Sequence, residues 1–381
     1  MSDEKQNYQK LHHDALVADL HCDTVIPMRR GYDIAQRHDC HHIDLPRLQE
    51  GGIDIQVFAA CCNLVELETS SRDHVIESLD LLRSELGKYP DQIEICLTTA
   101  DILKARAANK IAGILAIEGG LALDSDSADV EYFYNKGVRL ITISHETPTG
   151  WCANWKEQDT GVLGLTDLGR EIIAEMNRLG MIIDLSHSSD NTVAEVLKIA
   201  DRPVIASHSG ARSLCGHRRN LTDEQIKAIA ASGGMIGVTF VNNFISEKYN
   251  NAYNEFWNTI SAEQLKSLMR LYSSPLPDDE YQQALQKDFG FIIDGERKLE
   301  NLRVAVKDVV DHIDHMVSLV GPDYVGIGSD FDGMSSTPIG LEDCSKLANI
   351  TKELAARNYS EIDIKKILGG NILRVFAGVC G

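Results

Sequence analysis

The sequence contains no long hydrophobic segment. No run reaches the roughly 18 apolar residues that a membrane-spanning helix needs. The first residues, MSDEKQNYQKLHHDA, also have no apolar core like that of a secretory signal peptide. The nine cysteines include no C-x-x-C pair, a pattern that is not typical of a disulfide framework. We therefore expect a cytoplasmic protein without a membrane partner.

Basic side chains are also scarce. The chain has 37 lysines and arginines against 57 aspartates and glutamates, which gives a formal charge of -20. Such a surface repels phosphate backbones and anionic lipids. Nucleic acids and membrane surfaces are therefore poor partners for this chain.

Short runs of apolar, often β-branched residues recur along the chain, with helix-forming stretches between them. Eight such units can close a barrel, and barrels of this kind commonly have about 200 to over 400 residues. We therefore predict one α/β domain over residues 1–381, a (β/α)8 TIM-like barrel of the metal-dependent hydrolase type. The eight predicted strands are residues 15–20, 53–60, 112–117, 138–143, 180–186, 203–207, 234–240 and 324–329.

One segment interrupts this rhythm. Residues 245–303, before the eighth strand, are rich in Asn, Tyr, Glu and Gln. Ser261 with Gln264 predicts the start of one helix in this segment, and PLPDDEYQQAL predicts another. Because long barrel insertions usually form lids or subunit contacts, we expect a lid over the barrel or a contact in a homodimer.

Polar side chains with metal-binding atoms follow the predicted strands. In an α/β barrel the carboxyl ends of the strands meet at one face, where active sites lie. These residues are His21 and Asp23 after ALVADL, Glu118 after GILAI, His145 after LITIS, His187 after MIIDLS, and His208 after PVIAS. Their convergence predicts a metal-dependent hydrolytic site.

The first pair indicates the type of metal. His21 and Asp23 are two residues apart and so share a face of their strand, whereas Cys22 points the other way. Imidazole and carboxylate ligands suit zinc first, with manganese, cobalt or iron as alternatives.

Most of the thirteen histidines have an ordinary structural explanation. His312 and His315 lie three residues apart in VKDVVDHIDHM, where we expect a solvated helix face. His217, beside two arginines, remains ambiguous. The others outside the predicted site fall in loops or helices: His12, His13, His38, His41, His42 and His74.

Two ions explain the ligand set better than one. His21 and Asp23 would hold the first ion, His187 and His208 the second, and Glu118 would bridge them. A shared hydroxide would then be the nucleophile. The eighth strand, VGIGSDFDG, ends at Asp330, which could carry the proton, but Asp332 has the same strand parity and stays an alternative.

These segments resemble the membrane dipeptidase, or renal dipeptidase, family of zinc peptidases within the amidohydrolase-like barrels. The resemblance covers most of the chain outside residues 245–303. The segments that carry it are LVADLHCDT, GILAIEGG, GLTDLGREIIAEMNRLGMIIDLSHSS, PVIASHSGARSLCGHRRNLTDEQI, VGIGSDFDG and GGNILRVF.

The resemblance implies a role for each candidate residue. It implies two zinc ions held by His21, Asp23, His187 and His208 and bridged by Glu118. It also implies that Asp330 transfers the proton, that His145 contacts the substrate and stabilises the oxyanion, and that Arg219 binds the C-terminal carboxylate. An arginine fork would limit cleavage to dipeptides, including those with a C-terminal D-residue. Without the resemblance, Arg218 and Arg219 are equal candidates.

The sequence also departs from the family pattern. Animal members carry a signal peptide, disulfides and a lipid anchor, so this chain is more similar to a bacterial, cytoplasmic branch. After His145 the segment ETPTGWCANW differs from many relatives, which leaves the side-chain preference open. Two alternatives remain: another binuclear amidohydrolase acting on a lactone or cyclic amide, and a metal-binding scaffold without activity.

Overall fold

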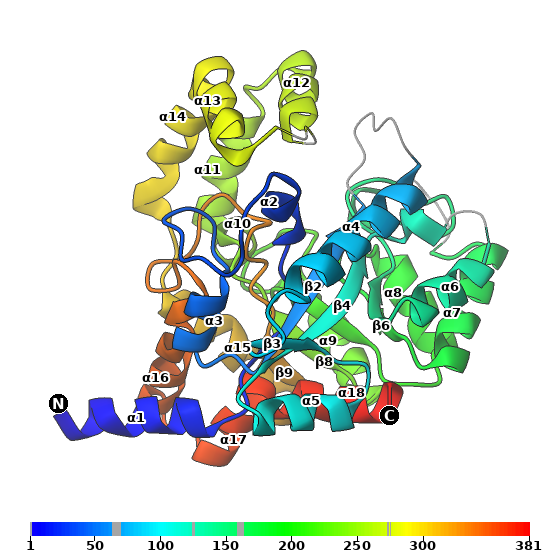
Figure 1. Ribbon diagram of the computed structural model, residues 1–381, viewed down its shortest axis with the longest axis vertical. Coiled ribbons are helices and arrows are strands. Elements are labelled where there is room, and N and C mark those ends of the chain that lie inside the picture. The colour runs from blue at the N-terminus through cyan, green and yellow to red at the C-terminus, as the bar shows by residue number, and fades with distance from the viewer. Residues whose placement is uncertain (1, 63–69, 124–125, 158–163, 273, 275) are drawn as a thin grey trace.

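Parallel strands form a barrel in the computed structural model, which describes residues 2–62, 70–123, 126–157, 164–272, 274 and 276–381 (Figure 1). Neighbouring strands pair in the order β1-β2-β4-β5-β6-β7-β8-β9. Their bounds are β1 Ala18–Asp19, β2 Ile55–Cys61, β4 Ile111–Glu118, β5 Val138–Thr142, β6 Ile182–Asp184, β7 Ile205–Ser209, β8 Met235–Val238 and β9 Val325–Ile327.

The first and last strands close the barrel. The backbone N–H of Leu20 donates to the carbonyl oxygen of Ile327 at 3.0 Å. Beyond this bond, the N–H of Ser329 donates to the buried carboxylate of Asp19 at 2.8 Å. Asp19 therefore fastens the two strands at the end where the candidate ligands follow.

All eight predicted strands are confirmed, although several are shorter than expected. The extreme case is β1, which has two residues where we predicted 15–20. One strand was missed: β3, Ile93–Ile95, pairs with β4 outside the barrel order. It has only three residues, and the middle one is the charged Glu94, so the sequence shows no recognisable strand pattern there.

Helices surround the barrel, as predicted for strand-helix units. Within the described residues, none is both long and apolar enough to cross a membrane. Their bounds are α1 Ser2–Asp14, α2 Val25–Arg29, α3 Leu45–Glu50, α4 Ser71–Leu86, α5 Thr99–Ala107, α6 Ala128–Asn135, α7 Asp167–Leu179, α8 Asp190–Ile199, α9 Asp223–Ala231, α10 Asn242–Ile245, α11 Glu247–Trp257, α12 Ala262–Tyr272, α13 Asp278–Asp288, α14 Gly290–Leu299, α15 Val306–Val320, α16 Ala348–Ala356, α17 Glu361–Lys365 and α18 Asn371–Val379.

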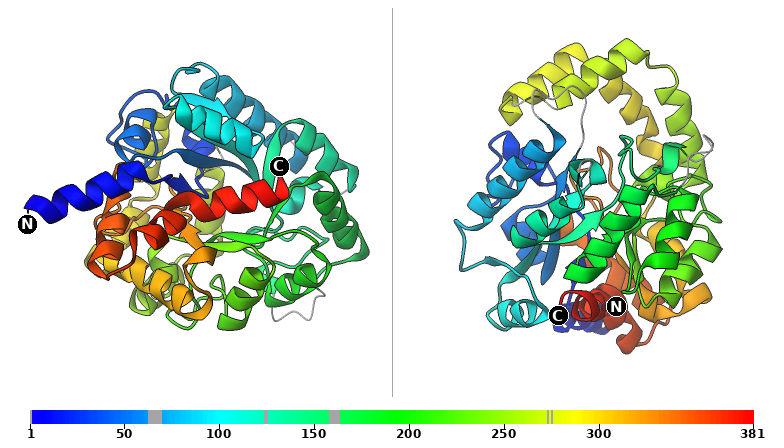
Figure 2. Two further views of the ribbon diagram at one scale, coloured as in Figure 1. Left: turned by 90° about the horizontal axis from the view of Figure 1, so that it is seen from below. Right: turned by 90° about the vertical axis from the view of Figure 1, so that its right-hand side faces the viewer.

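The inside of the barrel is packed with apolar side chains. Val57, Ile114 and Ile182 from three strands form one buried cluster with Phe376 of α18. Figure 2 shows α18 crossing beneath the barrel, on the side where both chain termini lie. This end is therefore closed by the core, which leaves the opposite end for a site.

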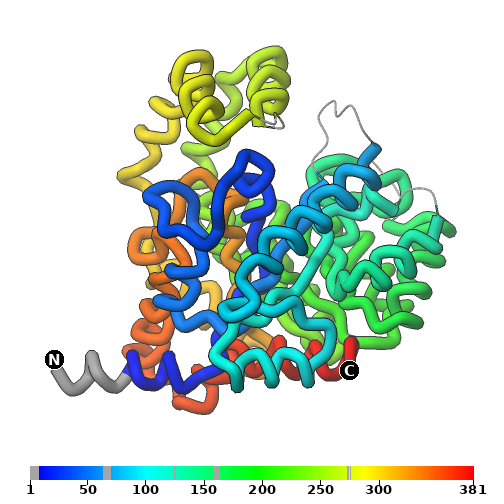
Figure 3. Tube along the Cα trace, viewed as in Figure 1, coloured from blue at the N-terminus to red at the C-terminus, as the bar shows by residue number. Residues whose placement is uncertain are grey.

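The predicted insertion lies at that opposite end. Helices α11 to α14 lie in the upper part of Figure 1, and the same segment is the yellow-green and yellow part of the tube in Figure 3. They have a small apolar cluster of their own, centred on Leu268, Phe289 and Ile292. The predicted capping pair is present, because Ser261 and Gln264 each bond the other's backbone N–H.

The expectation for His312 is wrong. This residue of α15 is buried, with 1% of its surface exposed, and does not lie on a solvated face. Its Nδ1 accepts from the N–H of Ala211 at 2.9 Å, and its Nε2 lies 3.0 Å from the carbonyl oxygen of Ile245. Two backbone groups from other elements therefore hold a neutral imidazole, which the helix pattern alone could not indicate.

Candidate active site

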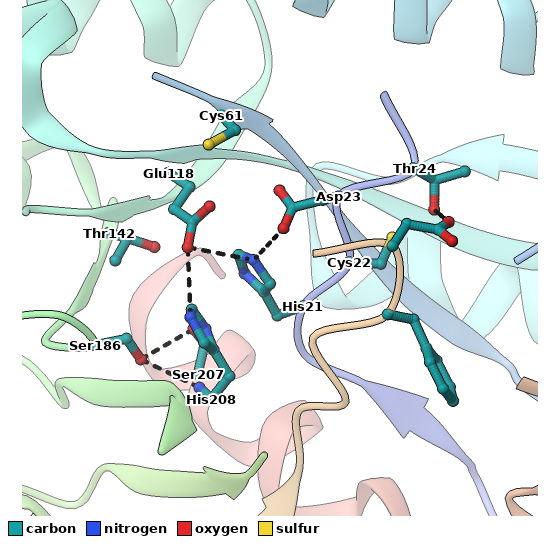
Figure 4. Close-up of polar contacts among 12 residues, drawn as sticks. His21, Cys22, Asp23, Thr24, Cys61, Glu118, Thr142, Ser186, Ser207 and His208 are labelled. Carbon is teal, nitrogen blue, oxygen red and sulfur yellow. Dashed lines mark hydrogen bonds and ion pairs between the residues drawn. The ribbon is translucent and has the colours of Figure 1, made fainter. Parts of the chain in front are cut away.

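Four histidines from the ends of four different strands converge on one carboxylate oxygen at the open end of the barrel. Glu118 is the last residue of β4 and is buried. Figure 4 shows its side chain facing His21 and His208. The Nε2 atoms around Glu118 Oε1 lie at 3.4 Å for His21, 3.6 Å for His145, 3.1 Å for His187 and 3.4 Å for His208.

A first group of ligand atoms lies on the β1 and β9 side. His21 Nε2 is 3.7 Å from Asp23 Oδ2, and ligand atoms of His21, Asp23 and Asp330 lie within 4.8 Å of one another. Both ring nitrogens of His21 and Asp23 Oδ1 are buried, without a hydrogen-bond partner among the described residues. Because such atoms are costly to leave unpaired, this donor set fits a bound cation.

Cys22 takes no part in this group, as predicted. Its thiol donates to the carbonyl oxygen of Val57 at 3.3 Å, and Figure 4 shows it turned away from Glu118.

A second group is formed by His187 and His208, whose Nε2 atoms lie 3.1 Å apart. The Nδ1 of His208 lies 2.7 Å from the hydroxyl of Ser207, which donates its own hydrogen to Asp184. Nδ1 therefore carries the proton, and the Nε2 lone pair of His208 faces Glu118. On the other ring, Nδ1 of His187 lies 3.2 Å from Oε1 of Glu146. A hydrogen-bond partner such as Ser207 orients a metal-binding histidine.

The electrostatics also favour a cation. Burial raises the pKa of Asp23 to about 6, and the charge of Glu118 contributes. Burial likewise raises the pKa of Asp330 well above its ordinary value, helped by Asp23 and Glu118. For Glu118, burial alone would raise the pKa, but His145 and His21 lower it well below normal. Three carboxylates crowded in a buried site repel one another, and metal ions relieve that repulsion.

The structure separates Asp330 from Asp332. Both oxygens of Asp332 are taken, one by the hydroxyl of Thr24 at 2.7 Å and the other by the backbone N–H of His42 at 2.7 Å. Asp330 instead lies beside His21 and Asp23. Asp332 therefore joins two loops, while Asp330 has its carboxylate in the ligand cluster.

The two candidate arginines, Arg218 and Arg219, differ in how deeply they are buried. Arg218 is exposed, whereas Arg219 is buried, with 3% of its surface exposed. Nη1 of Arg219 donates to the hydroxyl of Ser209 at 3.1 Å, while its Nε and Nη2 have no hydrogen-bond partner among the described residues. Nδ1 of His217 accepts a hydrogen bond from the backbone N–H of Arg219 at 3.1 Å. This histidine, which the sequence left ambiguous, therefore supports the backbone of Arg219.

The sequence matches the family model of the membrane dipeptidases, peptidase family M19, over residues 5–380. The chain belongs to this family. Dipeptidase 3 of Mus musculus is 32% identical over 343 residues, which cover 88% of this chain but only 57% of that protein. A probable dipeptidase from Pseudomonas aeruginosa shares the fold, with a TM-score of 0.80 and 23% identity over 99% of this chain and 98% of its own.

A further relative has been solved with a ligand. The metallopeptidase of Rhodobacter sphaeroides, bound to a phosphinate mimic of the dipeptide L-Ala-D-Ala, has a TM-score of 0.75 and 23% identity over 96% of this chain and 99% of its own. Membership of the M19 family implies a metal cofactor for this chain. The fold prediction, a metal-dependent hydrolase barrel with an insertion before the last strand, is confirmed.

Sequence reasoning missed two residues of this M19 site. Cys61, at the end of β2, lies 4.0 Å from Nδ1 of His145 and within reach of Glu118. Glu146 follows His145 and contacts His187. The signal for Cys61 was available, since it follows an apolar strand like the other candidates. No disulfide links any of the nine cysteines, all of which lie in the described residues.

Proposed function

We propose that this chain is a metal-dependent dipeptidase that hydrolyses the peptide bond of dipeptides. The observation that carries the proposal is the buried guanidinium of Arg219, which has two nitrogens without a partner among the described residues and lies near enough to feel the charges of Asp330 and Glu118. A free C-terminal carboxylate is the group that such a fork binds best. An arginine that holds this carboxylate beside the cluster would restrict cleavage to substrates with one residue after the scissile bond.

We assign His21 and Asp23 to one divalent ion, His187 and His208 to the other, and Glu118 to both. The nitrogen and oxygen donors favour zinc, with Mn2+, Co2+ or Fe2+ as alternatives. When bound, these ions would supply a hydroxide nucleophile at neutral pH.

Protein side chains would manage the proton and the developing charge. Asp330, with its raised pKa, is suited to take up a proton at neutral pH and return it to the leaving amine. Burial lowers the pKa of His145 to about 4, so its ring is neutral and donates one N–H. We assign this N–H to the substrate carbonyl oxygen, where negative charge develops during attack.

The same assignment predicts a stereochemical asymmetry. A C-terminal residue held by its carboxylate can turn its side chain toward the barrel mouth, so a D-residue should be accepted there. The N-terminal residue has less freedom, because its amino group and its carbonyl must both meet the ligand cluster and Asp330. The Rhodobacter sphaeroides relative, with its L-Ala-D-Ala mimic, supports this proposal.

Hydrolysis of stereoisomeric dipeptides tests the proposed function directly. The zinc-reconstituted protein should cleave L-Ala-D-Ala faster than D-Ala-L-Ala. Faster cleavage of the second peptide would falsify the asymmetry. Hydrolysis of lactones or cyclic amides, but of no dipeptide, would assign a different amidohydrolase activity.

Metal analysis tests the ligand assignment. Mass spectrometry under native conditions should detect two more bound ions in the wild-type protein than in Glu118→Ala, and this variant should also lose activity. Glu224→Ala, at an exposed position of α9, is a matched control that should keep both. A difference of only one ion between the two proteins at saturation would contradict the binuclear assignment.

A further inference from the structure

A second group of metal-binding side chains lies outside the catalytic cluster. It consists of Cys40 and His41, in the loop after α2, and Asp278, the first residue of α13. Nε2 of His41 is 3.2 Å from Asp278 Oδ1, and the thiol of Cys40 is 4.0 Å from Asp278 Oδ2. The three ligand atoms lie within 4.8 Å of one another. The group therefore joins the first barrel loop to the insertion.

The two inner atoms of this group lack ordinary partners. His41 Nε2 and Asp278 Oδ1 are buried as atoms, and neither has a hydrogen-bond partner in the described part of the chain. They are close enough to attract one another, but they are not aligned for a hydrogen bond. An imidazole nitrogen and a carboxylate oxygen that face one another, with a thiol beside them, form the donor set of a transition-metal site.

The backbone around the two loop ligands is held firmly. Arg47 donates to the carbonyl oxygen of His41 at 2.9 Å and to that of Cys40 at 3.4 Å. The ring of Tyr32 packs edge-on against His41, with centroids 5.0 Å apart. These contacts fix the loop from the barrel side, so the ligands do not have to be ordered by the ion.

The third ligand is fixed from the side of the insertion. The backbone N–H of Asp278 donates to the carbonyl oxygen of Arg30 at 3.3 Å. The first turn of α13 is thus already seated on the barrel, and its carboxylate faces the loop. Preorganised ligands on two separate elements are what a cross-linking metal site needs.

We propose that Cys40, His41 and Asp278 bind a zinc-like transition metal ion that fastens the insertion to the barrel. The thiolate and imidazole favour Zn2+ or Co2+ over Mg2+ and Ca2+, which prefer oxygen ligands. Three protein ligands leave a fourth position, and the exposed side of Cys40 gives water access to it. This site is independent of the catalytic one and does not require the proposed dipeptidase activity.

Cobalt absorption spectroscopy distinguishes this site from the catalytic centre. A Co2+ ion bound to a thiolate gives a sulfur-to-metal charge-transfer band in the near ultraviolet, whereas imidazole and carboxylate ligands give none. Titration of the metal-free, full-length protein with Co2+ should produce this band. Cys40→Ser should abolish it, and His41→Ala and Asp278→Asn should each weaken cobalt binding at least tenfold.

Cys61→Ser is the matched control, because Cys61 is the cysteine beside the catalytic ligands. This variant should keep the band. A band that persists in Cys40→Ser and disappears in Cys61→Ser would move the thiolate to the catalytic centre and overturn the proposal. A band unaffected by His41→Ala and Asp278→Asn would mean adventitious binding to one cysteine, and no band at saturating Co2+ would mean no such site.

Limited proteolysis gives a second readout that does not depend on activity. Zn2+ should slow cleavage within α11 to α14 in the wild-type protein but not in Cys40→Ser. Equal protection of both proteins would show that the ion does not hold the insertion.

Discussion

At the scale of single residues, the barrel mouth contains unusual backbone conformations. The φ angles of His187, Asp330 and Asp332 are 66°, 69° and 67°. They lie in the left-handed region, which residues other than glycine seldom adopt. Such conformations cost about 1 to 3 kcal/mol each and tend to occur at functional sites. Gly333 follows, and a Cβ there would collide with the carboxylates of Asp23 and Asp330. The turn after β9 is therefore shaped around the ligand cluster.

Replacing Asp330 tests its assignment as the proton carrier. Asp330→Asn should lower kcat by about 10² to 10⁴-fold, the usual contribution of general acid-base catalysis, while metal content stays unchanged. Asp332→Asn is the comparison, since Asp332 bonds only loop groups in the described structure. It should lower stability more than kcat. Loss of metal in Asp330→Asn would make Asp330 a ligand instead.

Replacing Arg219 tests the carboxylate fork. Arg219→Ala should raise KM for free-acid dipeptides by an amount equivalent to about 2 to 5 kcal/mol, because a buried charged hydrogen bond is lost. C-terminally amidated dipeptides should be affected far less. The exposed Arg218→Ala should change neither KM. An equal effect of Arg219→Ala on acid and amide would place the carboxylate pocket elsewhere.

At the scale of elements, α15 is tied to its neighbours by a histidine that must stay neutral. Nδ1 of His312 accepts a hydrogen bond from the backbone N–H of Ala211. Protonation of Nδ1 would place a second hydrogen against this N–H and break the bond. Burial lowers the pKa of this ring below its ordinary value of 6.5. The unfolded chain therefore takes up a proton at a higher pH than the folded chain does.

This difference predicts a pH effect on stability. The contribution of His312 should be complete above about pH 6.5 and should decrease as the pH falls below it. His312→Gln, which can still accept and donate, should flatten the decrease in urea-unfolding free energy between neutral pH and about pH 5. The exposed His13→Gln is the control and should leave the slope unchanged. An unchanged slope in His312→Gln would contradict the assignment.

We propose that the insertion acts as a lid. A cavity of about 50 Å³ is lined by Cys61 from the barrel and Tyr272 from α12, so the insertion reaches the rim of the catalytic cluster. Arg30 holds it there, since its guanidinium donates to the carbonyl oxygen of Tyr272 and lies 3.6 Å from the ring centroid of Tyr281.

Loosening this attachment should change substrate binding before it unfolds the barrel. Arg30→Ala should raise KM for dipeptides and speed proteolysis within α11 to α14, with a change in unfolding free energy of about 1 to 2 kcal/mol at most. Arg37→Ala, whose partner Glu50 lies on α3, should have neither effect. A change from dimer to monomer in light scattering, with KM unaltered, would identify a subunit contact instead of a lid.

At the scale of the whole molecule, the metal centre should contribute to global stability. Its ligands come from strands spread around the barrel, so ions bound there hold the folded form together. Zinc at about 100 times its dissociation constant should stabilise the folded protein by about 2.7 kcal/mol per site. A chelator should therefore lower Tm in calorimetry, and added zinc should restore it. An unchanged Tm would mean that the ligands bind no ion under those conditions.

The sequence by itself determined the fold class and the type of chemistry. Alternating apolar runs and helices specify a barrel, and the residue that follows each strand must lie at its mouth, because parallel strands end on one face. The order of residues along the chain is therefore enough to predict that His21, Glu118 and His208 meet. The capping signal of Ser261 and Gln264 likewise acts within one turn of helix and was confirmed.

Only the tertiary structure decided between neighbours with the same local pattern. Arg219 differs from Arg218, and Asp330 from Asp332, through burial and through partners that lie far away in the chain. The pairing of Cys40 and His41 with Asp278 spans more than two hundred residues, which no periodicity along the chain encodes. The alternation along a strand determines which face a side chain is on and at which end of the barrel it lies. Packing between elements that are distant in the chain determines which atoms that side chain contacts.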